Sequence, residues 1–547
     1  MNPPPSPGYG AVLALVIFIV GSIWLGFLAQ RVTEKGSFLK SYFLGNRGLG
    51  AWTIALTATV QSGGTFMGFP SLVYTHGWSV ALWISGYMLV PLMGFGVLGK
   101  RIAHLSRQTG AVTIPDLYRA RFESPAAGYV CSIVIVLCMT VMMIAQFKAG
   151  ALIMQLAWPG SGMLAVSEDV EIASQRAYWI GLAVFSLTVI GYTLVGGFLA
   201  AVWTDLFQSL LMFFGVMLLL FLTLPLAGGL EKATRDAAAT IPATGDSTTP
   251  YVNTPDAYAH LPGYSPKPGE TFLPFSRALS FFIFWPFVGM ATPAGVVRIM
   301  ACKDTKTLRR SVFLLCLYNL GIYLPLVMIC ICAHAILPPL GPNESDQVIP
   351  RIALVATQSL PGGSFFAGLI LAAPFGAVMA TVSSYLVVIA SGLVRDLYQR
   401  YLRPQANEFE LRRASHWAMI GVGLFAVAAN IWPPQFLQKI VVFSSGAIGA
   451  AFIVPTFMLC YFRRATAAGV MAAMFGGAGT VFTLNVAGLL LELQRSGQWN
   501  KFSAYDIGGL GFDPLLWGAL VSLVCGVIGS VLSAPPSEKA IAAYFDA

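Results

Sequence analysis

The run Gln61-Ser62-Gly63-Gly64 lies inside an apolar stretch, about residues 50–74, that is long enough to cross a bilayer. Its paired glycines weaken a helix. An unpaired backbone group in lipid costs several kcal/mol, so a break survives only where the freed amides and carbonyls face protein, water, an ion or a solute. This run therefore predicts a cavity inside the membrane.

A second apolar stretch, about residues 275–297, is interrupted by Trp285-Pro286, Gly289 and Pro293-Ala294-Gly295. The second break lies five spans after the first, which indicates two related halves with a binding site between them. A unit with an odd number of crossings inverts when it is repeated, which gives the inverted topology on which alternating access is built in many transporters. The alternative, kinks filled by neighbouring side chains, is common in membrane helices and stays open.

The composition indicates an all-α polytopic membrane protein. Of 547 residues, 56% are hydrophobic and only 10% are charged, and the mean hydropathy is +0.74. A soluble fold of this length needs more charge to cover its surface. Thirteen apolar segments are predicted to be transmembrane helices: about 10–30, 50–74, 78–99, 126–156, 177–195, 205–227, 275–297, 311–337, 363–391, 415–432, 439–461, 467–492 and 513–533.

The predicted repeats divide the chain into five parts. They are an extra helix and first cytoplasmic loop (1–49), a first inverted repeat of spans two to six (50–227), an irregular outer loop (228–274), a second inverted repeat of spans seven to eleven (275–461), and two C-terminal helices with a cytoplasmic tail (462–547). The segment 493–512 is predicted to be a smaller irregular outer loop.

The lysines and arginines set the predicted orientation. Most of the 32 fall in alternate loops if the N-terminus is outside and the C-terminus is cytoplasmic. Anionic lipid headgroups account for the net charge of +9, so no nucleic-acid partner is needed. The first segment lacks a signal-peptide pattern and is predicted to stay as a span of the cell membrane. The eight cysteines lie in or beside apolar spans and are interpreted as small core residues.

The residues around the first break, and one face of the ninth span, suit a small cation. Ala58, Gln61 and Gly64 are expected to present free carbonyls at the break. Ala377, Ala380, Thr381 and Ser384 stand at i, i+3, i+4 and i+7, so they share one helix face rich in small residues and hydroxyls. Hard cations bind several oxygens. Close helix packing explains the same face equally well.

Aromatic and hydroxyl side chains are candidates for the solute pocket: Thr65, Trp83, Tyr87, Trp285 and the pair Ser444-Ser445. Most membrane aromatics are packing residues or interface anchors, so only some of these are expected to touch solute. Lys148 lies well inside a span, where a charge costs at least ~2.5 kcal/mol. It either snorkels toward the outer surface or binds an anionic solute.

Other classes of protein lack their sequence signals here. No GxxxxGK[ST] phosphate loop occurs, so an ion gradient rather than ATP is the expected energy source. The five histidines are dispersed, so an enzyme is not expected, and neither is an enzymatic cofactor. A channel or a substrate sensor built on the same scaffold remains an alternative.

Four runs resemble the sodium/solute symporter family over nearly the whole chain: Tyr42-Phe43-Leu44-Gly45-Asn46-Arg47, Thr113-Ile114-Pro115-Asp116, Gly196-Gly197-Phe198-Leu199-Ala200-Ala201-Val202-Trp203-Thr204-Asp205 and Arg395-Asp396-Leu397-Tyr398. Within the family the chain resembles the sodium/pantothenate symporters, through Leu56-Thr57-Ala58-Thr59, Val297-Arg298 with Lys303-Asp304, Gln347-Val348-Ile349-Pro350 and Leu371-Ala372-Ala373-Pro374.

The resemblance implies a leucine-transporter-type core of five plus five inverted helices, with Na⁺ as the coupling ion. By motif position, backbone oxygens of Ala58, Gln61 and Ala377 and the hydroxyl of Thr381 are expected to bind sodium. Ala380 stands where the family commonly has serine, so Ser384 or a water replaces that ligand, sodium affinity falls, or coupling is lost. Substrate is expected at the two breaks.

The resemblance also implies that Asp205 lies on the sodium path toward the cytoplasm. The alternative reading of Asp205 is a helix-start carboxylate that forms a capping box with Gln208. The expected function is sodium-coupled import of pantothenate or a similar small carboxylate. Proline or another amino acid, a sugar or a monocarboxylate are alternative solutes.

Overall fold

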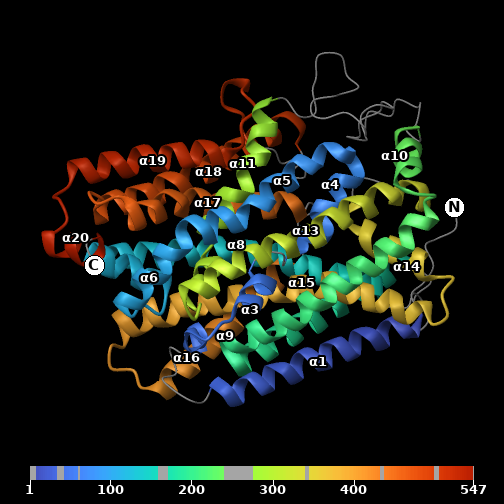
Figure 1. Ribbon diagram of the computed structural model, residues 1–547, viewed down its shortest axis with the longest axis horizontal. Helices are drawn as coiled ribbons and strands as arrows, with labels where there is room; N and C mark the ends of the chain where they lie inside the picture. The colour runs from blue at the N-terminus through green and yellow to red at the C-terminus, as the bar shows by residue number, and fades with distance from the viewer. Residues whose placement is uncertain are drawn as a thin grey trace.

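The computed structural model describes residues 8–33, 42–58, 62–157, 170–239, 275–338, 340, 344–431, 437–497 and 504–545. Every regular element in these residues is helical (Figure 1). The longer elements of the first half are α1 (Tyr9–Thr33), α3 (Ala51–Thr57), α4 (Phe69–His76), α5 (Ala81–Val90), α6 (Lys100–Thr109), α7 (Ile114–Phe122), α8 (Pro125–Ala157), α9 (Val170–Leu226) and α10 (Leu230–Ala239). Those of the second half are α11 (Phe275–Ala291), α12 (Pro293–Met300), α13 (Thr305–Ile336), α14 (Val348–Thr357), α15 (Gly363–Ser391), α16 (Glu408–Ala429), α17 (Leu437–Tyr461), α18 (Ala467–Ser496), α19 (Pro514–Leu532) and α20 (Glu538–Phe545). Short π or 3₁₀ segments join several of them, including η2 (Gly64–Gly68), η4 (Pro91–Gly99), η5 (Ser345–Gln347), η6 (Gly392–Leu402) and η7 (Ile507–Gly509).

Helix occupies most of the described residues of each of the thirteen predicted spans, although length and hydropathy alone support fewer crossings. In the described residues nine helices are long and apolar enough to span a membrane, or ten if α11 and α12 form one bent span. One of the nine has 52 residues within α9, about 78 Å of helix, whereas the hydrocarbon core is about 30 Å thick. The number thirteen therefore stays a prediction.

A glycine divides α9 into its two predicted crossings. Gly197 has φ 57° and ψ −141°, a conformation that side chains with a Cβ rarely adopt. A Cβ at this position would also lie 2.6 Å from the Tyr42 ring. The chain bends here, and the segment that carries Asp205 continues from the bend.

Segments that are predicted to lie on opposite sides of the membrane are found at opposite ends of the molecule. α10 and α14 lie at one end, and α6 and α20 lie at the other (Figure 1). The first pair belongs to segments assigned outside, and the second pair to segments assigned to the cytoplasm. The loop 228–274, predicted to be irregular, begins with the amphipathic helix α10, and its residues 240–274 lie outside the described part.

The first break is observed where the sequence predicts it. α3 ends at Thr57, residues 59–61 lie outside the described part, and helix resumes at Gly63. Ala58 and Ser62 flank the gap.

The second break is narrower than predicted. α11 continues through Trp285 and Pro286 to Ala291, and only Thr292 is non-helical, with φ −58° and ψ 123°, before α12 departs at 42°. Pro286 cannot donate to the carbonyl of Phe282. That carbonyl lies against Gly86 of α5, where an added Cβ would be only 2.3 Å away, so the missing side chain of Gly86 leaves room for it.

α15 lies at the centre of the bundle. Of its most apolar window, 83% is buried, compared with 33% for α1. It packs against α9, α1 and α8. The hydroxyl-bearing face predicted for the ninth span therefore faces protein rather than lipid.

A backbone bridge joins the two broken spans at the end predicted to be cytoplasmic. The N–H of Leu49, just before α3, donates to the carbonyl of Ala301 at 3.2 Å, and the N–H of Lys303 donates to the carbonyl of Leu49 at 3.2 Å. The start of one broken span and the end of the other are thus held together.

The C-terminal helix α20 is anchored at the same end by arginines from three segments. The guanidinium carbons of Arg101, Arg121 and Arg463 lie 5.1, 5.1 and 5.5 Å from the centroid of the Phe545 ring. Arg101 also donates to the backbone carbonyl of Tyr544. These cation–π contacts tie α20 to α6, to α7 and to the segment after α17.

Candidate functional site

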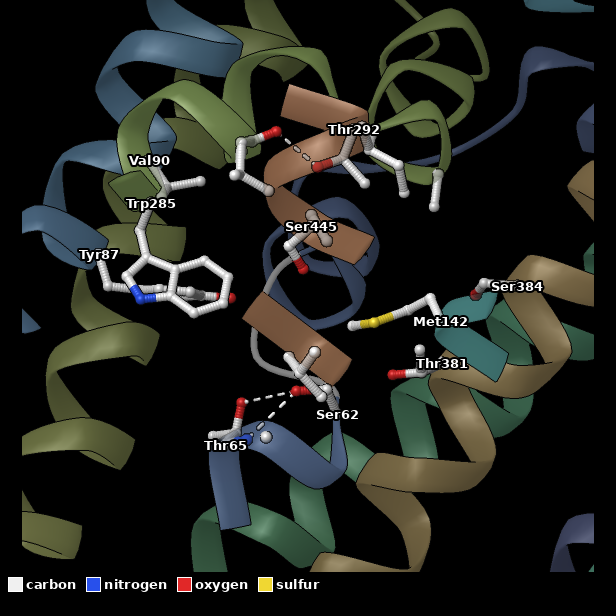
Figure 2. Close-up of a pocket in the computed structure, with 18 of the residues that line it drawn as sticks. Ser62, Thr65, Tyr87, Val90, Met142, Trp285, Thr292, Thr381, Ser384 and Ser445 are labelled. Carbon is white, nitrogen blue, oxygen red and sulfur yellow. Dashed lines mark hydrogen bonds between the residues drawn. The ribbon is translucent and has the colours of Figure 1, made fainter. Parts of the chain in front are cut away.

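A cleft joins both breaks to the central helix α15. It contains about 1050 Å³ of space not filled by atoms, including open solvent at its mouth. Its lining includes Ala58, Ser62 and Thr65 at the first break, Trp285, Thr292 and Arg298 at the second, Ala380, Thr381 and Ser384 on α15, and Tyr87, Tyr323 and Ser445 from neighbouring helices. Figure 2 shows several of these side chains around a common space. The cavity predicted from the broken spans is present.

Side chains satisfy the freed backbone at the first break. The N–H of Gly63 donates to Oε1 of Gln146, on α8, at 2.7 Å. The N–H of Thr65 donates to Oγ of Ser62 at 3.2 Å (Figure 2). The Gln146 side chain, from the unbroken helix α8, thus replaces the carbonyl that Gly63 would bond in a continuous helix. This bond lowers the free energy of the break.

Two of the predicted sodium ligands contact each other on α15. The hydroxyl of Thr381 donates to the carbonyl of Ala377 at 3.2 Å. Thr381 and Ala58 both line the cleft. Gln61 lies outside the described residues. At Ala380 the cleft meets a methyl group where a serine would add an oxygen.

A buried ion pair lies beside this face. Nη2 of Arg298, on α12, is 2.6 Å from Oδ2 of Asp205, and their side chains are 4% and 0% exposed. The same nitrogen donates to Oγ of Ser384 at 2.8 Å. Ser384 Oγ already accepts a bond from Arg298, so a sodium ion bound by Ser384 would compete with the guanidinium for the same oxygen.

The position of Asp205 excludes the capping interpretation. It lies inside α9, eight residues after the bend at Gly197, and its carboxylate accepts bonds from Arg298, Ser383 and Ser384. A capping carboxylate would instead accept from amides of the first helical turn. The capping-box alternative with Gln208 is therefore wrong.

Aromatic rings form one wall of the cleft. Tyr87 of α5 lies against Trp285 of α11, with ring centroids 5.2 Å apart, and against Tyr323 of α13 at 4.6 Å. The hydroxyl of Tyr323 is 3.2 Å from that of Thr65. This wall connects the two broken spans through α5 and α13.

Three residues that were predicted to line the pocket are not among the described lining residues. Lys148 is not among the described lining residues, and it lies close enough to Asp346, in η5, for their charges to interact. Burial raises the pKa of the Asp346 carboxyl above its usual value, and the Lys148 ammonium opposes this rise. Ser444 donates to the carbonyl of Ile440 at 2.6 Å, and Ser445 lines the cleft instead. Trp83 lies on α5, but its side chain is outside the described part.

The sequence interpretation missed two residues of the cleft. Arg298 belongs to a run that was assigned only to the family resemblance, and its place one helical turn after Pro293-Ala294-Gly295 is the signal that could have found it. Tyr323 is one of many aromatics in an unbroken span, and no local pattern distinguishes it.

The chain belongs to the sodium:solute symporter family, whose model matches residues 42–477. It is therefore a sodium-coupled secondary transporter of the membrane and not an enzyme. The family resemblance stated from the sequence is confirmed.

The relatives of this chain are named for different substrates. The sodium/pantothenate symporter of Haemophilus influenzae is 30% identical over 88% of this chain and 92% of its own length. The sodium/proline symporter of the same organism is 28% identical over 86% of this chain and 87% of its own length. A solved structure of a Na⁺-coupled sialic acid symporter, described as substrate-bound and outward-open, has a TM-score of 0.70, 18% identity and coverage of 97% of this chain and 99% of its own. This likeness confirms the all-helical fold with its leucine-transporter-type core.

Proposed function

We propose that this symporter imports a small organic solute bearing a carboxylate, pantothenate or a similar compound, through the cleft between its two broken spans. The observation that carries the proposal is the cleft itself, where both breaks and the hydroxyl face of α15 meet. The pantothenate symporter of Haemophilus influenzae supports this solute class. Proline is the second candidate, because the proline symporter is nearly as similar.

The coupling ion is proposed to bind between the first break and α15. Its ligands would be backbone oxygens of Ala58, Gln61 and Ala377 and the hydroxyl of Thr381, and Ser384 would join them in competition with Arg298. One sodium ion that enters the cell gains about 2.3 kcal/mol per 100 mV of membrane potential, and its concentration gradient adds to this. That free energy drives the solute uphill.

The charges of the cleft suit the joint entry of a cation and an anion. Among its described lining residues Arg298 is the one with a full charge, and Asp205 neutralises it. A sodium ion and a monocarboxylate together add no net charge to this apolar space, which limits the desolvation cost. The proposed solute contacts are Gln61, Thr65, Trp83, Tyr87 and Trp285. Lys148 and Ser444 are left out because they are not among the described residues that line the cleft.

Alternating access would come from the two repeats, 50–227 and 275–461. The N-terminus is proposed to be outside and the C-terminus cytoplasmic. Asp205 would lie on the path of sodium toward the cytoplasm, where its pair with Arg298 has to open and close.

Uptake by proteoliposomes tests the proposal. Radiolabelled pantothenate, proline, sugars and short monocarboxylates are compared with and without an inward sodium gradient. We expect saturable, sodium-dependent uptake of the carboxylate. Ion current without solute would indicate a channel, and binding without net uptake would indicate a sensor; either result refutes symport.

Substitutions on α15 test the sodium site. Thr381→Val removes the hydroxyl and keeps the shape, so we expect the sodium concentration for half-maximal uptake to rise about tenfold or more. Ser391→Ala is the matched control, because its hydroxyl donates to the carbonyl of Val388 in the same helix and does not line the cleft. Equal effects of the two variants would contradict the assigned site.

A further inference from the structure

Tyr323 occupies a central place in the wall of the cleft without being on either broken span. It lies on the continuous helix α13 and is 4% exposed. Its hydroxyl is 3.2 Å from Oγ1 of Thr65, and its ring packs against Tyr87 at 4.6 Å and Phe69 at 5.7 Å. Its neighbours therefore come from three different elements, η2, α4 and α5.

These contacts connect one break with the other. Thr65 belongs to η2, the first turn after the first break. Tyr87 lies against Trp285 of α11, the helix that leads to the second break. A change in the position of Tyr323 would therefore move groups at both breaks.

The hydroxyl groups form a chain whose direction is not fixed. Oγ of Ser62 is 3.3 Å from Oγ1 of Thr65, Thr65 is hydrogen-bonded to Tyr323, and the side chains of Tyr323 and Tyr87 are hydrogen-bonded. In the first two pairs either oxygen can be the donor. Each hydroxyl has one proton to donate, so the direction of the chain decides whether its Ser62 end offers the cleft a proton or a lone pair.

We propose that Tyr323 is a positioning residue that sets the direction of this hydroxyl chain. When Tyr323 donates toward Tyr87, Thr65 donates to Tyr323 and Ser62 to Thr65, so the Ser62 end offers the cleft a lone pair. When the order is reversed, Tyr323 donates to Thr65 and Thr65 to Ser62, so Ser62 donates its proton into the cleft. A solute with a carboxylate or carbonyl stabilises the donating order, because hydrogen bonds in a chain polarise one another. Tyr323 thus favours solutes with a strong acceptor group over those without one. This inference rests on the proposed function.

The test compares two phenylalanine variants of the same helix. Tyr323→Phe keeps the ring and cuts the chain. Tyr318→Phe is the matched control: Tyr318 is buried on α13, its hydroxyl donates to the backbone carbonyl of Ser209 at 2.9 Å, and it does not line the cleft. Uptake is measured for pantothenate and for the analogue in which a hydroxymethyl group replaces the carboxylate.

For Tyr323→Phe we expect the KM for the carboxylate to rise roughly three- to tenfold, the effect of one hydrogen bond, with kcat changed less than twofold. The preference for the carboxylate over the alcohol should fall by the same factor. Tyr318→Phe should leave both KM and preference at the wild-type values. Equal effects of the two variants, or a change in kcat alone, would overturn the inference.

A double-mutant cycle with Thr65→Val tests the chain directly. In the Thr65→Val background, Tyr323→Phe should change KM by less than twofold, since the link is already cut. Additive effects would count against the inference. Wild-type protein that takes up none of the solutes would refute the proposed function instead. Thermal unfolding of the wild type, the two single variants and the double variant tests the chain independently of uptake. Non-additive changes in stability support the link between Thr65 and Tyr323, and additive changes overturn it.

Discussion

The buried pair of Arg298 and Asp205 gives the sharpest prediction about stability. Both side chains are almost completely buried, at 4% and 0% exposure, and their charged atoms are 2.6 Å apart. Removing one partner of such a pair leaves an unpaired charge in an apolar surrounding and typically costs about 3–5 kcal/mol. Replacing both partners by neutral side chains of similar size avoids that cost and is often nearly neutral.

The two single variants should differ, because only one of the remaining charges can be neutralised. After Arg298→Met the Asp205 carboxylate can take up a proton, whereas after Asp205→Asn the Arg298 guanidinium stays charged at any accessible pH. We therefore expect Asp205→Asn to lower the melting temperature more than Arg298→Met does. Acidifying the buffer should restore part of the loss in Arg298→Met and none of it in Asp205→Asn.

Thermal unfolding of the purified protein in detergent measures these effects for both single variants and the double variant. The exposed pair of Arg235 and Glu231, with side chains 75% and 86% exposed, provides the control, since Arg235→Gln should leave the melting temperature within error of wild type. The reasoning fails if the double variant loses as much stability as the sum of the single variants.

Three further predictions concern other contacts. Gln146→Leu removes the acceptor for the N–H of Gly63, so the free energy of unfolding should fall by about 1–3 kcal/mol, and unchanged thermal stability would contradict the role of this bond. Ala380→Ser adds an oxygen to the cleft, so the sodium concentration for half-maximal uptake should fall roughly two- to tenfold; an unchanged or higher value would argue against a cation beside this residue. Phe545→Ala removes a ring from the arginines around α20, including Arg121, and should lower stability by about 1–2 kcal/mol while making the tail more sensitive to added protease.

The architecture was largely predictable from the sequence, because apolar spans and helix breaks depend on residues that are neighbours in the chain. Helix occupies most of the described residues of each predicted span, and the first break lies between Thr57 and Gly63, directly before the predicted glycine pair Gly63-Gly64. The width of the second break was not predictable, because a proline breaks a helix only if nothing accommodates the freed carbonyl. The carbonyl of Phe282 that Pro286 leaves free lies against Gly86, 200 positions before Pro286 in the chain, and only tertiary packing brings the two segments together.

The candidate site was predicted in part for the same reason. Thr65, Tyr87, Trp285 and Thr381 line the cleft as the spacing and the breaks indicated. Tyr323 was missed because an unbroken helix carries no local mark of a binding site.

The backbone bridge between Leu49 and Cys302 bears on how the molecule can move. Two hydrogen bonds of about 0.5–1.5 kcal/mol each couple the segment directly before α3 to the segment directly after α12. If α3 slid past α12, both bonds would break. If the two helices tilted together, both bonds would be kept. Under the proposed alternating access, we therefore expect the segment that enters α3 and the segment that leaves α12 to move together.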